Sequence, residues 1–506
     1  MLYTQRIFYP QVADPQRWQR MLGFLERHRT LCHEISFFTE GDGTDWRWLP
    51  PDEIAQRASV LGEAVRQARE RGFAVAINVL NTMGHSDEGG ADAPLPDWRR
   101  MIGHDGSESR CTPCPQDQRF LDYVRMKYRA FAGTGAERYW IDDDVRLNHH
   151  APVARGCFCA VCCASLAMRL GREPLPGAAL AAVFDQEPAG RVAWDAHLRA
   201  VLGAVIDAAV EGVRAVQPQA EIGLMTCEPH DQVDWMARLG RGGHRPWLRP
   251  GGGFWNDDEP RALLRKLITV NAQCDGLPTD AGITYEVENY PYAIGAKSAA
   301  MTGWECLLAV LSGRLDGVMF DVLDGIGNDP ASHDAWLARL EGWAPHLDAV
   351  APLVAGTASI GWMAVSGGLH HSQILQEAGL PLVGERSGAR GWLVTGPAAQ
   401  RLSVAEFTAL FALPVLMDGE AAQRCLELGL GERIGLDAVE AHREGIHEVF
   451  TDHPLNAGDV GALRGFTLRY FGLTSHALAP RAGTALLSRL VSTSGRALGA
   501  ACTLHS

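Results

Sequence analysis

Residues 139–146 read Tyr-Trp-Ile-Asp-Asp-Asp-Val-Arg, an apolar run that ends in three consecutive acids. A short apolar run is typical of a buried strand, and the residues after it lie at its carboxyl end. In a (β/α)8 barrel these strand ends face the reaction site. The stretch therefore predicts a catalytic or substrate-binding role for at least one of Asp142, Asp143 and Asp144. The structural alternative is that they cap the next segment or pair with Arg146.

Short β-type runs alternate with longer amphipathic stretches from the N-terminus to about residue 355, as in a parallel α/β architecture. Eight strands with intervening helices fit a TIM (β/α)8 barrel better than an open sheet. The expected helices include Pro51–Glu70, Gln118–Phe131 and Val192–Val216, and residues 331–355 are expected to close the barrel. The expected strands are Leu2–Tyr9, His33–Glu40, Ala74–Asn81, Arg138–Asp144, Glu221–Cys227, Arg245–Pro250, Ile283–Tyr290 and Gly317–Leu323.

A second acidic strand lies in residues 283–292, Ile-Thr-Tyr-Glu-Val-Glu-Asn-Tyr-Pro-Tyr. Period-two alternation puts Glu286 and Glu288 on the same side of this strand, pointing into the barrel. An inward glutamate is costly unless it lies at the open end or pairs with a buried cation. Two carboxyl groups that face each other across a pocket are what glycosidic cleavage requires. The second strand thus supplies the partner for the Asp run.

Further polar and aromatic side chains at the predicted strand ends are candidates for substrate binding. The Trp residues can stack on sugars, and those on loops (Trp46, Trp98 and Trp255) are better candidates than Trp48 and Trp304. The polar candidates are Glu40, Asn78, Asn81, His85, Arg146, Asn289, Tyr290, Asp321 and Asp324.

Six of the twelve cysteines crowd into two short segments, 111–114 and 157–163. Thiolates one and two residues apart can converge on one tetrahedral ion, and another can come from a distant loop. Soft ligands favour zinc, and an all-thiolate set makes the ion structural. The alternative is a group of free buried cysteines. Cys111 and Cys163 flank the segments and could replace a ligand within them.

A second α/β pattern follows the barrel and predicts a smaller, doubly wound domain over 356–455. Its expected strands are Ser359–Val365, Leu380–Gly384, Gly391–Thr395 and Pro414–Met417, and its helices Ser403–Phe411 and Gly419–Leu428. The remainder, 456–506, has β-like fragments and is expected to form a small C-terminal segment.

The 506 residues carry a net charge of −14, which argues against a nucleic-acid partner. The sequence shows no secretory signal and no apolar run long enough to span a membrane. With the cysteine pattern, these features favour a cytoplasmic protein.

The cysteine spacing resembles that of glycoside hydrolase family 42 β-galactosidases. Cys114-Pro115, then the fourth strand, then Cys157, Cys159 and Cys162 follow the family's zinc motif, and Phe8-Tyr9-Pro10 and Arg17-Trp18 resemble its opening. The resemblance implies a TIM barrel, a flavodoxin-like trimerisation domain and a small β domain. It also implies a homotrimer that cleaves glycosides, with structural zinc.

The same resemblance implies residue roles. Asp144 takes the place of the family's acid/base glutamate, and Asp143 the place of its asparagine. Glu288, followed by Pro291, fits the nucleophile best, with Glu286 as the second choice. An aspartate at the acid/base position departs from the family, so the retaining outcome and galactose specificity do not follow from the resemblance.

The main expectation is therefore a glycosidase, retaining and exo-acting on β-linked sugars, of β-galactosidase or β-mannosidase type. A non-catalytic carbohydrate-binding protein is one alternative. A metal-dependent hydrolase that uses the Asp142–Asp144 run is another.

Overall fold

The computed structural model divides into two compact units, Met1–Ser359 and Ile360–Ser506. The residues that it describes are 1–41, 47–85, 95–228, 231–253, 256–259, 262–289, 296–323, 329–357, 360–365, 379–383, 386–442, 446–466 and 474–506.

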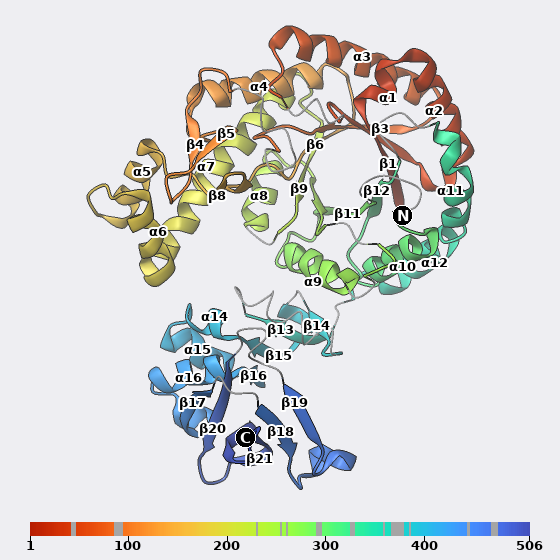
Figure 1. Ribbon diagram of the computed structural model, residues 1–506. Helices are drawn as coiled ribbons and strands as arrows, with labels where there is room; N and C mark the ends of the chain where they lie inside the picture. Colours follow the sequence, from red (N-terminus) through yellow and green to blue (C-terminus); the bar gives the residue numbers. More distant parts are fainter. Residues whose placement is uncertain are drawn as a thin grey trace. The chain divides into compact units, whose positions relative to one another are not determined.

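The first unit is a closed barrel of eight parallel strands, which confirms the predicted fold class. Each strand pairs with the next one along the chain, and the last pairs with the first (Figure 1). The strands are β1 (Leu2–Ile7), β2 (Glu34–Phe38), β3 (Ala74–Val79), β6 (Arg138–Ile141), β9 (Glu221–Thr226), β10 (Pro246–Pro250), β11 (Gly282–Glu288) and β12 (Gly317–Asp321).

An outer ring of helices surrounds this barrel (Figure 1). The predicted helix Pro51–Glu70 has the same bounds in the structure. The ring contains α1 (Tyr9–Ala13), α2 (Pro15–Arg27), α3 (Pro51–Glu70), α4 (Gln118–Ala132), α7 (Pro188–Arg214), α8 (Gln232–Leu239), α9 (Ala262–Cys274), α10 (Ala299–Val310), α11 (Asp334–Glu341) and α12 (Ala344–Val354). None of the helices in the described ranges combines the length and apolar composition that a membrane crossing requires.

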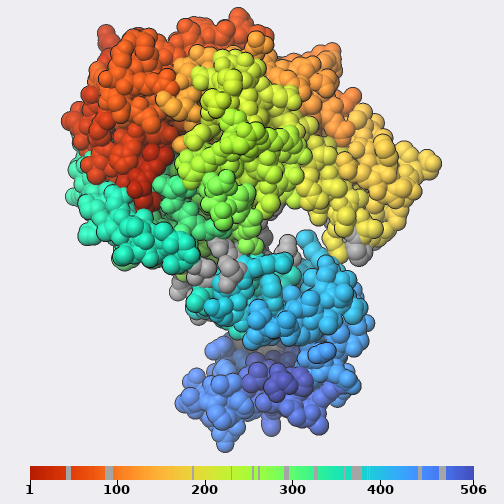
Figure 2. Space-filling view, turned by 180° about the vertical axis from the view of Figure 1, so that it is seen from behind, coloured from red at the N-terminus to blue at the C-terminus, as the bar shows by residue number. Residues whose placement is uncertain are grey.

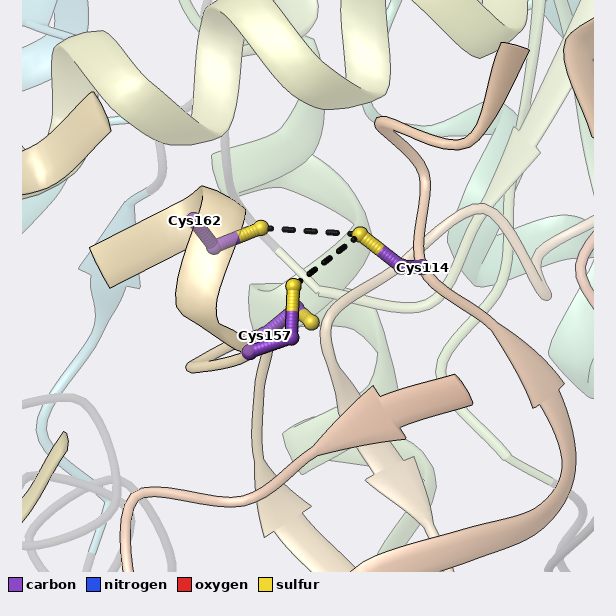
Figure 3. A group of neighbouring side chains, drawn as sticks. Cys114, Cys157 and Cys162 are labelled. Atoms are coloured by element: carbon purple, nitrogen blue, oxygen red, sulfur yellow. Dashed lines mark hydrogen bonds between the residues drawn. The ribbon is translucent and has the colours of Figure 1, made fainter. Parts of the chain in front are cut away.

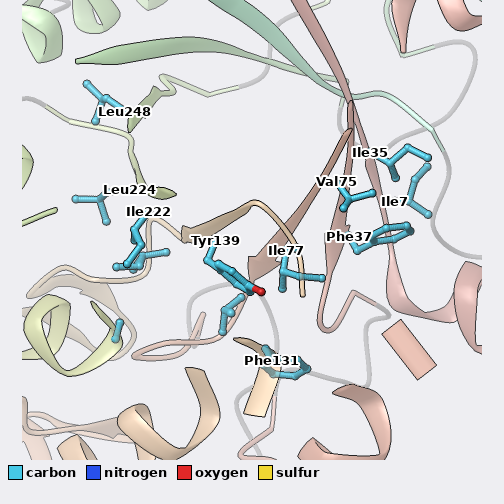
Figure 4. Packing of buried hydrophobic residues seen from close by; sticks show 14 of the residues in the cluster. Ile7, Ile35, Phe37, Val75, Ile77, Phe131, Tyr139, Ile222, Leu224 and Leu248 are labelled. Atoms are coloured by element: carbon cyan, nitrogen blue, oxygen red, sulfur yellow. The ribbon is translucent and has the colours of Figure 1, made fainter. Parts of the chain in front are cut away.

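The main hydrophobic core lies between the strands and this ring. Alternate strand residues, such as Ile35, Ile77 and Leu224, are fully or almost fully buried there (Figure 4). The intervening residues fill the barrel interior, where Trp140 and Trp247 are buried. Gly282 leaves room for one of these rings, because a Cβ on it would lie 2.4 Å from Trp247. Large side chains therefore fill the barrel interior toward the amino ends of the strands, whereas the polar residues of the interior lie toward the carboxyl ends.

Two excursions interrupt the barrel near β6. They are the hairpins β4 (Arg100–Ile102) with β5 (Glu108–Pro113) and β7 (Asn148–His150) with β8 (Val153–Arg155), followed by α5 (Ala160–Leu170) and α6 (Gly177–Gln186). Figures 1 and 2 show α5 and α6 projecting from the barrel as a lobe. The lobe has its own core, in which Phe158 stacks on Trp194 with ring centroids 5.3 Å apart.

The second unit begins with a parallel sheet in the order β14-β13-β15-β16, surrounded by short helices. Its elements are β13 (Gly361–Ala364), β14 (Leu382–Val383), β15 (Ala389–Val394), α14 (Gly396–Ala399), α15 (Val404–Leu410), β16 (Val415–Met417), α16 (Gly419–Glu427) and α17 (Gly431–Ile434). The four predicted strands and two predicted helices of this region are all present.

A six-stranded antiparallel sheet completes the second unit. It contains β17 (Leu436–His442), β18 (Ile446–Phe450), β19 (Leu463–Phe466), β20 (Ser475–Pro480), β21 (Ala485–Ser492) and β22 (Ala497–Leu504). Because β17 and β18 belong to it, the division expected at residue 455 falls within this sheet. The β structure expected for 456–506 therefore starts earlier, at Leu436.

Candidate active site at the carboxyl ends of the barrel strands

Two buried arginines and three buried acids form a charged layer across the barrel interior. Arg6 Nη1 lies 2.5 Å from Glu286 Oε1 and 3.3 Å from Asp321 Oδ2. Arg249 donates to Asp142 Oδ1 at 2.7 Å, and its Nε lies 3.2 Å from Glu286 Oε1. All five side chains are at most 4% exposed. Four of these inward residues belong to β1, β10, β11 and β12, and Asp142 directly follows β6, so the layer connects five strands.

The charged layer holds one more acid than base. Burial raises the pKa of Asp321 to about 7, against the opposing effect of Arg6. Asn78 of β3 joins the layer by donating to Asp142 Oδ2 at 2.9 Å and accepting from Arg249. A Cβ at Gly251 would lie 2.5 Å from Glu286 Oε2, so only glycine leaves room for this carboxylate. The charged layer is tightly packed, and its charged side chains pair with one another.

The two glutamates of β11 occupy different environments. Glu286 is 2% exposed and lies between Arg6 and Arg249, which was the structural alternative for an inward glutamate. Glu288 lies two residues closer to the open end of the barrel and is only partly buried. It pairs with Asp321 in the register of β11 and β12. Of the two, Glu288 is therefore the one that solvent and a substrate can reach.

The three consecutive aspartates after β6 separate toward different partners. Asp142 belongs to the charged layer. Asp143 instead pairs with Arg146, whose Nη1 lies 2.9 Å from Asp143 Oδ2. Cys227, after β9, donates its thiol to the same oxygen at 2.8 Å. Although burial opposes it, Arg146 and then His85 lower the pKa of Asp143 to about 2. With its side chain 14% exposed, Asp143 is an ionised group at the carboxyl ends of the strands.

Asp144 is held by the backbone that follows β3. Its Oδ2 accepts the N–H groups of Thr82, Met83 and Gly84 at 2.6–2.7 Å, while its Oδ1 is buried without a hydrogen-bond partner. Burial raises its pKa to about 6, against the opposing effects of His85 and the Gly84 amide. A proton on this carboxyl belongs on Oδ1, because Oδ2 already accepts three donors. Asp144 thus has the pKa of a general acid but is fully buried.

Three other predicted candidates are buried beside the strands β2 and β3. Lys127 of α4 donates to Glu40 Oε1 at 2.6 Å and to the Asn81 carbonyl at 2.7 Å. Glu40 is 0% exposed and also accepts from Thr39. His85 is 4% exposed, with Nε2 3.1 Å from the Leu80 carbonyl and 3.9 Å from Asp143. Glu40 and Asn81 therefore hold the loops together, and His85 lies closer to the acids.

A second buried charge cluster lies on the outer side of β11. Glu305 of α10 accepts from Lys266 Nζ at 2.8 Å, from Lys297 Nζ at 2.6 Å and from the Tyr285 hydroxyl at 3.0 Å. Its pKa is lowered, although burial opposes this, because the two ammonium groups face it. The lysines also donate to backbone oxygens of β11, Lys266 to Glu286 at 2.8 Å and Lys297 to Glu288 at 3.2 Å.

The remaining predicted residues fall into three groups. Asn289 is 4% exposed, and its buried Oδ1 has no hydrogen-bond partner. Trp48 and Trp98 pack against each other and against Phe120 and Tyr123, whereas Trp304 is 52% exposed beside Trp343. Four candidates lie outside the described residues: Trp46, Trp255, Tyr290 and Asp324.

Four cysteines converge next to the barrel, from β5's end and from the start of α5 (Figure 3). The sulfurs of Cys114, Cys157, Cys159 and Cys162 are buried and lie within 4.8 Å of one another. Cys114 Sγ is 3.6 Å from both Cys159 Sγ and Cys162 Sγ. Among the described residues, this is the one group of His, Cys, Asp or Glu side chains that could hold a metal, so the Asp run forms no such group.

Cys163, in contrast, donates its thiol to the Phe158 carbonyl at 3.1 Å and stays outside the group, as does Cys111. Gln116 Nε2 lies 3.5 Å from Cys162 Sγ, and the Cys114 sulfur raises the pKa of Arg99, although burial opposes it. The Gln116 amide and the Arg99 guanidinium are hydrogen-bond donors, which suit a group of thiolates.

Of the cations of the site, the sequence analysis predicted Arg146, which pairs with Asp143. It missed Arg6, Lys127, Arg249, Lys266 and Lys297, together with Glu305 and Cys227. One available signal was period two in the strands. Arg6 follows Thr4 on the inward side of β1, as Arg249 follows Trp247 on β10. An inward arginine in an apolar strand predicts an inward acid on another strand.

No protein-family model matches the sequence, and no curated protein matches it either. Solved structures do match along almost the whole chain. The β-galactosidase of Bacillus circulans sp. alkalophilus is 10% identical, with 98% of this chain and 83% of that chain covered and a TM-score of 0.64. The cold-adapted β-galactosidase of Rahnella sp. R3 is 12% identical (99% and 84% covered, TM-score 0.64).

A catalytic mutant of Gan42B, a GH42 β-galactosidase from G. stearothermophilus, is 9% identical (97% and 81% covered, TM-score 0.62). The chain therefore resembles glycoside hydrolase family 42 β-galactosidases in fold, at 9–12% sequence identity.

Proposed function

We propose that the chain is a glycoside hydrolase that cleaves β-linked sugars at the carboxyl ends of the barrel strands. The observation that carries the proposal is the contrast within β11. Glu286 is locked between two arginines, whereas Glu288, two residues on, is half-buried at the open end. The fold shared with β-galactosidases and the aspartates after β6 support the same assignment.

In the proposed reaction Glu288 is the nucleophile. Its carboxylate attacks the anomeric carbon while the leaving-group oxygen takes the proton of Asp144 Oδ1. In the second step Asp144 takes a proton from water, whose oxygen attacks the anomeric carbon and releases Glu288. This double displacement retains the anomeric configuration.

Two of the acids that follow β6, Asp143 and Asp144, would have different roles. Asp144 is proposed as the acid/base because its pKa is raised to about 6, so that it can hold a proton near neutral pH. Asp143 stays ionised and would accept hydrogen bonds from sugar hydroxyls, whereas Arg146 would donate to them. Because Asp144 is fully buried, the proposal requires a conformation in which the leaving group reaches Oδ1.

Azide distinguishes these roles through the anomer of the product. With a dinitrophenyl β-glycoside, Glu288→Ala should lose hydrolysis, and azide should yield the α-glycosyl azide. Asp144→Ala should accumulate the glycosyl-enzyme, and azide should yield the β-glycosyl azide. Asp143→Asn is the matched control, which should weaken kcat/KM without azide rescue. Full hydrolysis by Glu288→Ala would overturn the proposal.

The sugar is proposed at the level of the β-galactosidase or β-mannosidase type, with exo action. A panel of aryl β-glycosides of different sugars, assayed at equal concentration, identifies it. The same panel tests the carbohydrate-binding alternative, in which sugars bind without turnover.

We also propose that the four cysteines hold a structural zinc ion. Four buried sulfurs suit a tetrahedral thiolate site, since Zn–S bonds of about 2.3 Å place the sulfurs about 3.8 Å apart. The observed 3.6 Å separations are close to this value. Because four thiolates would complete the coordination shell of the ion, it would be structural, and the reaction would depend on the carboxylates. Turnover should therefore persist in EDTA under conditions that leave the protein folded, which a hydrolase with a metal on Asp142–Asp144 would not show.

On the family resemblance we propose a homotrimer located in the cytoplasm. Leu413, Leu416 and Leu504 support self-association, because they are 38–47% exposed and line one groove of the second unit. Light scattering of the purified protein at several concentrations measures the assembly.

A further inference from the structure

The lysine–glutamate cluster behind β11 has a close relation to the two glutamates of that strand. Lys266, Lys297 and Glu305 are each 1% exposed, so three charges are buried in a region that has no need of them for packing. Burying a charge costs several kcal/mol unless good geometry compensates it. A hydrophobic set of equal volume would serve stability as well. The cluster therefore calls for a reason other than stability.

The pairing of β11 gives that reason. On one side, β11 pairs with β12 up to Glu288 and Asp321. On the other side, pairing with β10 ends at Leu248 and Ile283. The carbonyl of Ile283 points to the β12 side, where it accepts from Asp316. By alternation, the carbonyls of Glu286 and Glu288 point to the side where β10 no longer pairs.

The two lysines supply the donors that β10 no longer offers. Lys266 Nζ reaches the Glu286 carbonyl at 2.8 Å, and Lys297 Nζ reaches the Glu288 carbonyl at 3.2 Å. Glu305 holds both ammonium groups in place at 2.8 and 2.6 Å. The end of β11 is thus fixed from outside the barrel, at the two residues whose side chains point inward.

We propose that Lys297 is a positioning residue for the nucleophile: held by Glu305, it fixes the backbone at Glu288 and thereby the direction of the Glu288 carboxylate. Lys266 does the same for Glu286, whose carboxylate is already fixed by Arg6 and Arg249. The inference rests on the proposed function, since it assigns the reactive carboxylate to Glu288. Neither lysine is proposed to contact the sugar.

The symmetry of the cluster provides a matched pair of variants. Lys297→Met and Lys266→Met each remove one ammonium group, one bond to Glu305 and one bond to a β11 carbonyl. We therefore expect similar losses in melting temperature. Only Lys297→Met frees the residue that reacts, and misplacement by about 1 Å can lower a rate by on the order of a hundredfold.

The measurement is the rate at which a 2-deoxy-2-fluoro glycoside with a dinitrophenol leaving group labels the enzyme, followed by intact mass. This leaving group needs no proton, so the rate reports on the nucleophile alone. We expect labelling of Lys297→Met to slow about a hundredfold, and that of Lys266→Met to stay close to the wild-type rate. Lys297→Arg, which keeps a donor and the charge, should recover part of the loss.

Equal slowing in both Met variants would overturn the inference while leaving the proposed function intact. A wild-type enzyme that is neither labelled nor active on any glycoside would overturn the proposed function first. Should Lys297→Met fail to fold, Glu305→Gln tests the same point, because its amide has one acceptor oxygen and an NH2 group that cannot accept from the second lysine. Slowed labelling of this variant, measured well below its melting temperature, then supports the inference, and an unchanged rate contradicts it.

Discussion

Glu286 and Glu288 are two residues apart, and they differ in burial. Glu286 is paired with Arg6 and Arg249 in the barrel interior, whereas Glu288 is only partly buried toward the open end. Removing one member of a buried ion pair leaves an uncompensated charge. We expect Glu286→Ala to lower the free energy of unfolding by about 3–5 kcal/mol, measured by urea denaturation. Glu288→Ala is the control and should cost less; an equal cost for both would contradict the assignment.

The buried carboxyl of Asp144 makes stability depend on pH. Its folded-state pKa of about 6 lies above the ordinary value of 3.8, because burial disfavours the charged form. The folded state therefore binds the proton more tightly, and this contribution is full below about pH 4 and is lost as the pH rises through 6. Relative to Asp144→Asn, which cannot ionise, the wild type should lose stability between pH 4 and 6. Parallel pH profiles of the two proteins would refute a raised pKa.

At the scale of elements, the N-cap of α4 ties the start of this helix to the residue that precedes β4. Asp117 accepts the N–H of Arg119 at 2.9 Å and the N–H of Arg99 at 2.7 Å. Loss of an N-cap costs about 1 kcal/mol, up to about 2. We expect Asp117→Ala to reach the upper end in urea denaturation, because two segments lose a partner, while Asp117→Asn keeps most of the stability. An Ala variant as stable as Asn would show that the cap contributes nothing.

Strand positions followed well from the sequence, and strand ends did not. Most expected strands ran past the observed carboxyl end, as in Arg138–Asp144 against Arg138–Ile141. Apolar periodicity marks the paired residues, but residues beyond the ladder, such as Asp143 and Asp144, take partners from other strands. Those partners depend on closure of the barrel. Lys266 and Lys297 could therefore not be predicted from local pattern, because they reach β11 from a helix and a loop.

Over the whole molecule, the order of the domains could be predicted from the sequence, because each has its own pattern of hydrophobic residues. Eight parallel strands and then a smaller parallel sheet follow one another as expected, whereas for the last segment only β-like fragments were expected. The boundary expected at residue 455 was wrong, because β17 directly follows α17 within one compact unit. The cysteine group could be predicted as well, because cysteines spaced by one and two residues rarely occur for a reason other than a shared ion.

A zinc ion at the cysteine group would tie the β5 hairpin to the projecting α5–α6 lobe, so its loss should destabilise the first unit. Cys162 and Cys163 are adjacent, but only Cys162 belongs to the group, and Cys163 bonds the Phe158 carbonyl. We expect Cys162→Ser to lower the zinc content from one ion per chain and to lower the melting temperature, by about 2–4 °C for each kcal/mol lost. Cys163→Ser should change neither, since serine can donate the same hydrogen bond. Elemental analysis and calorimetry measure both quantities. Chelation should shift the wild type toward the Cys162→Ser profile, and it should leave that variant unchanged because its ion is already absent. Equal zinc content in the two variants would mean that the four sulfurs lie together without holding an ion.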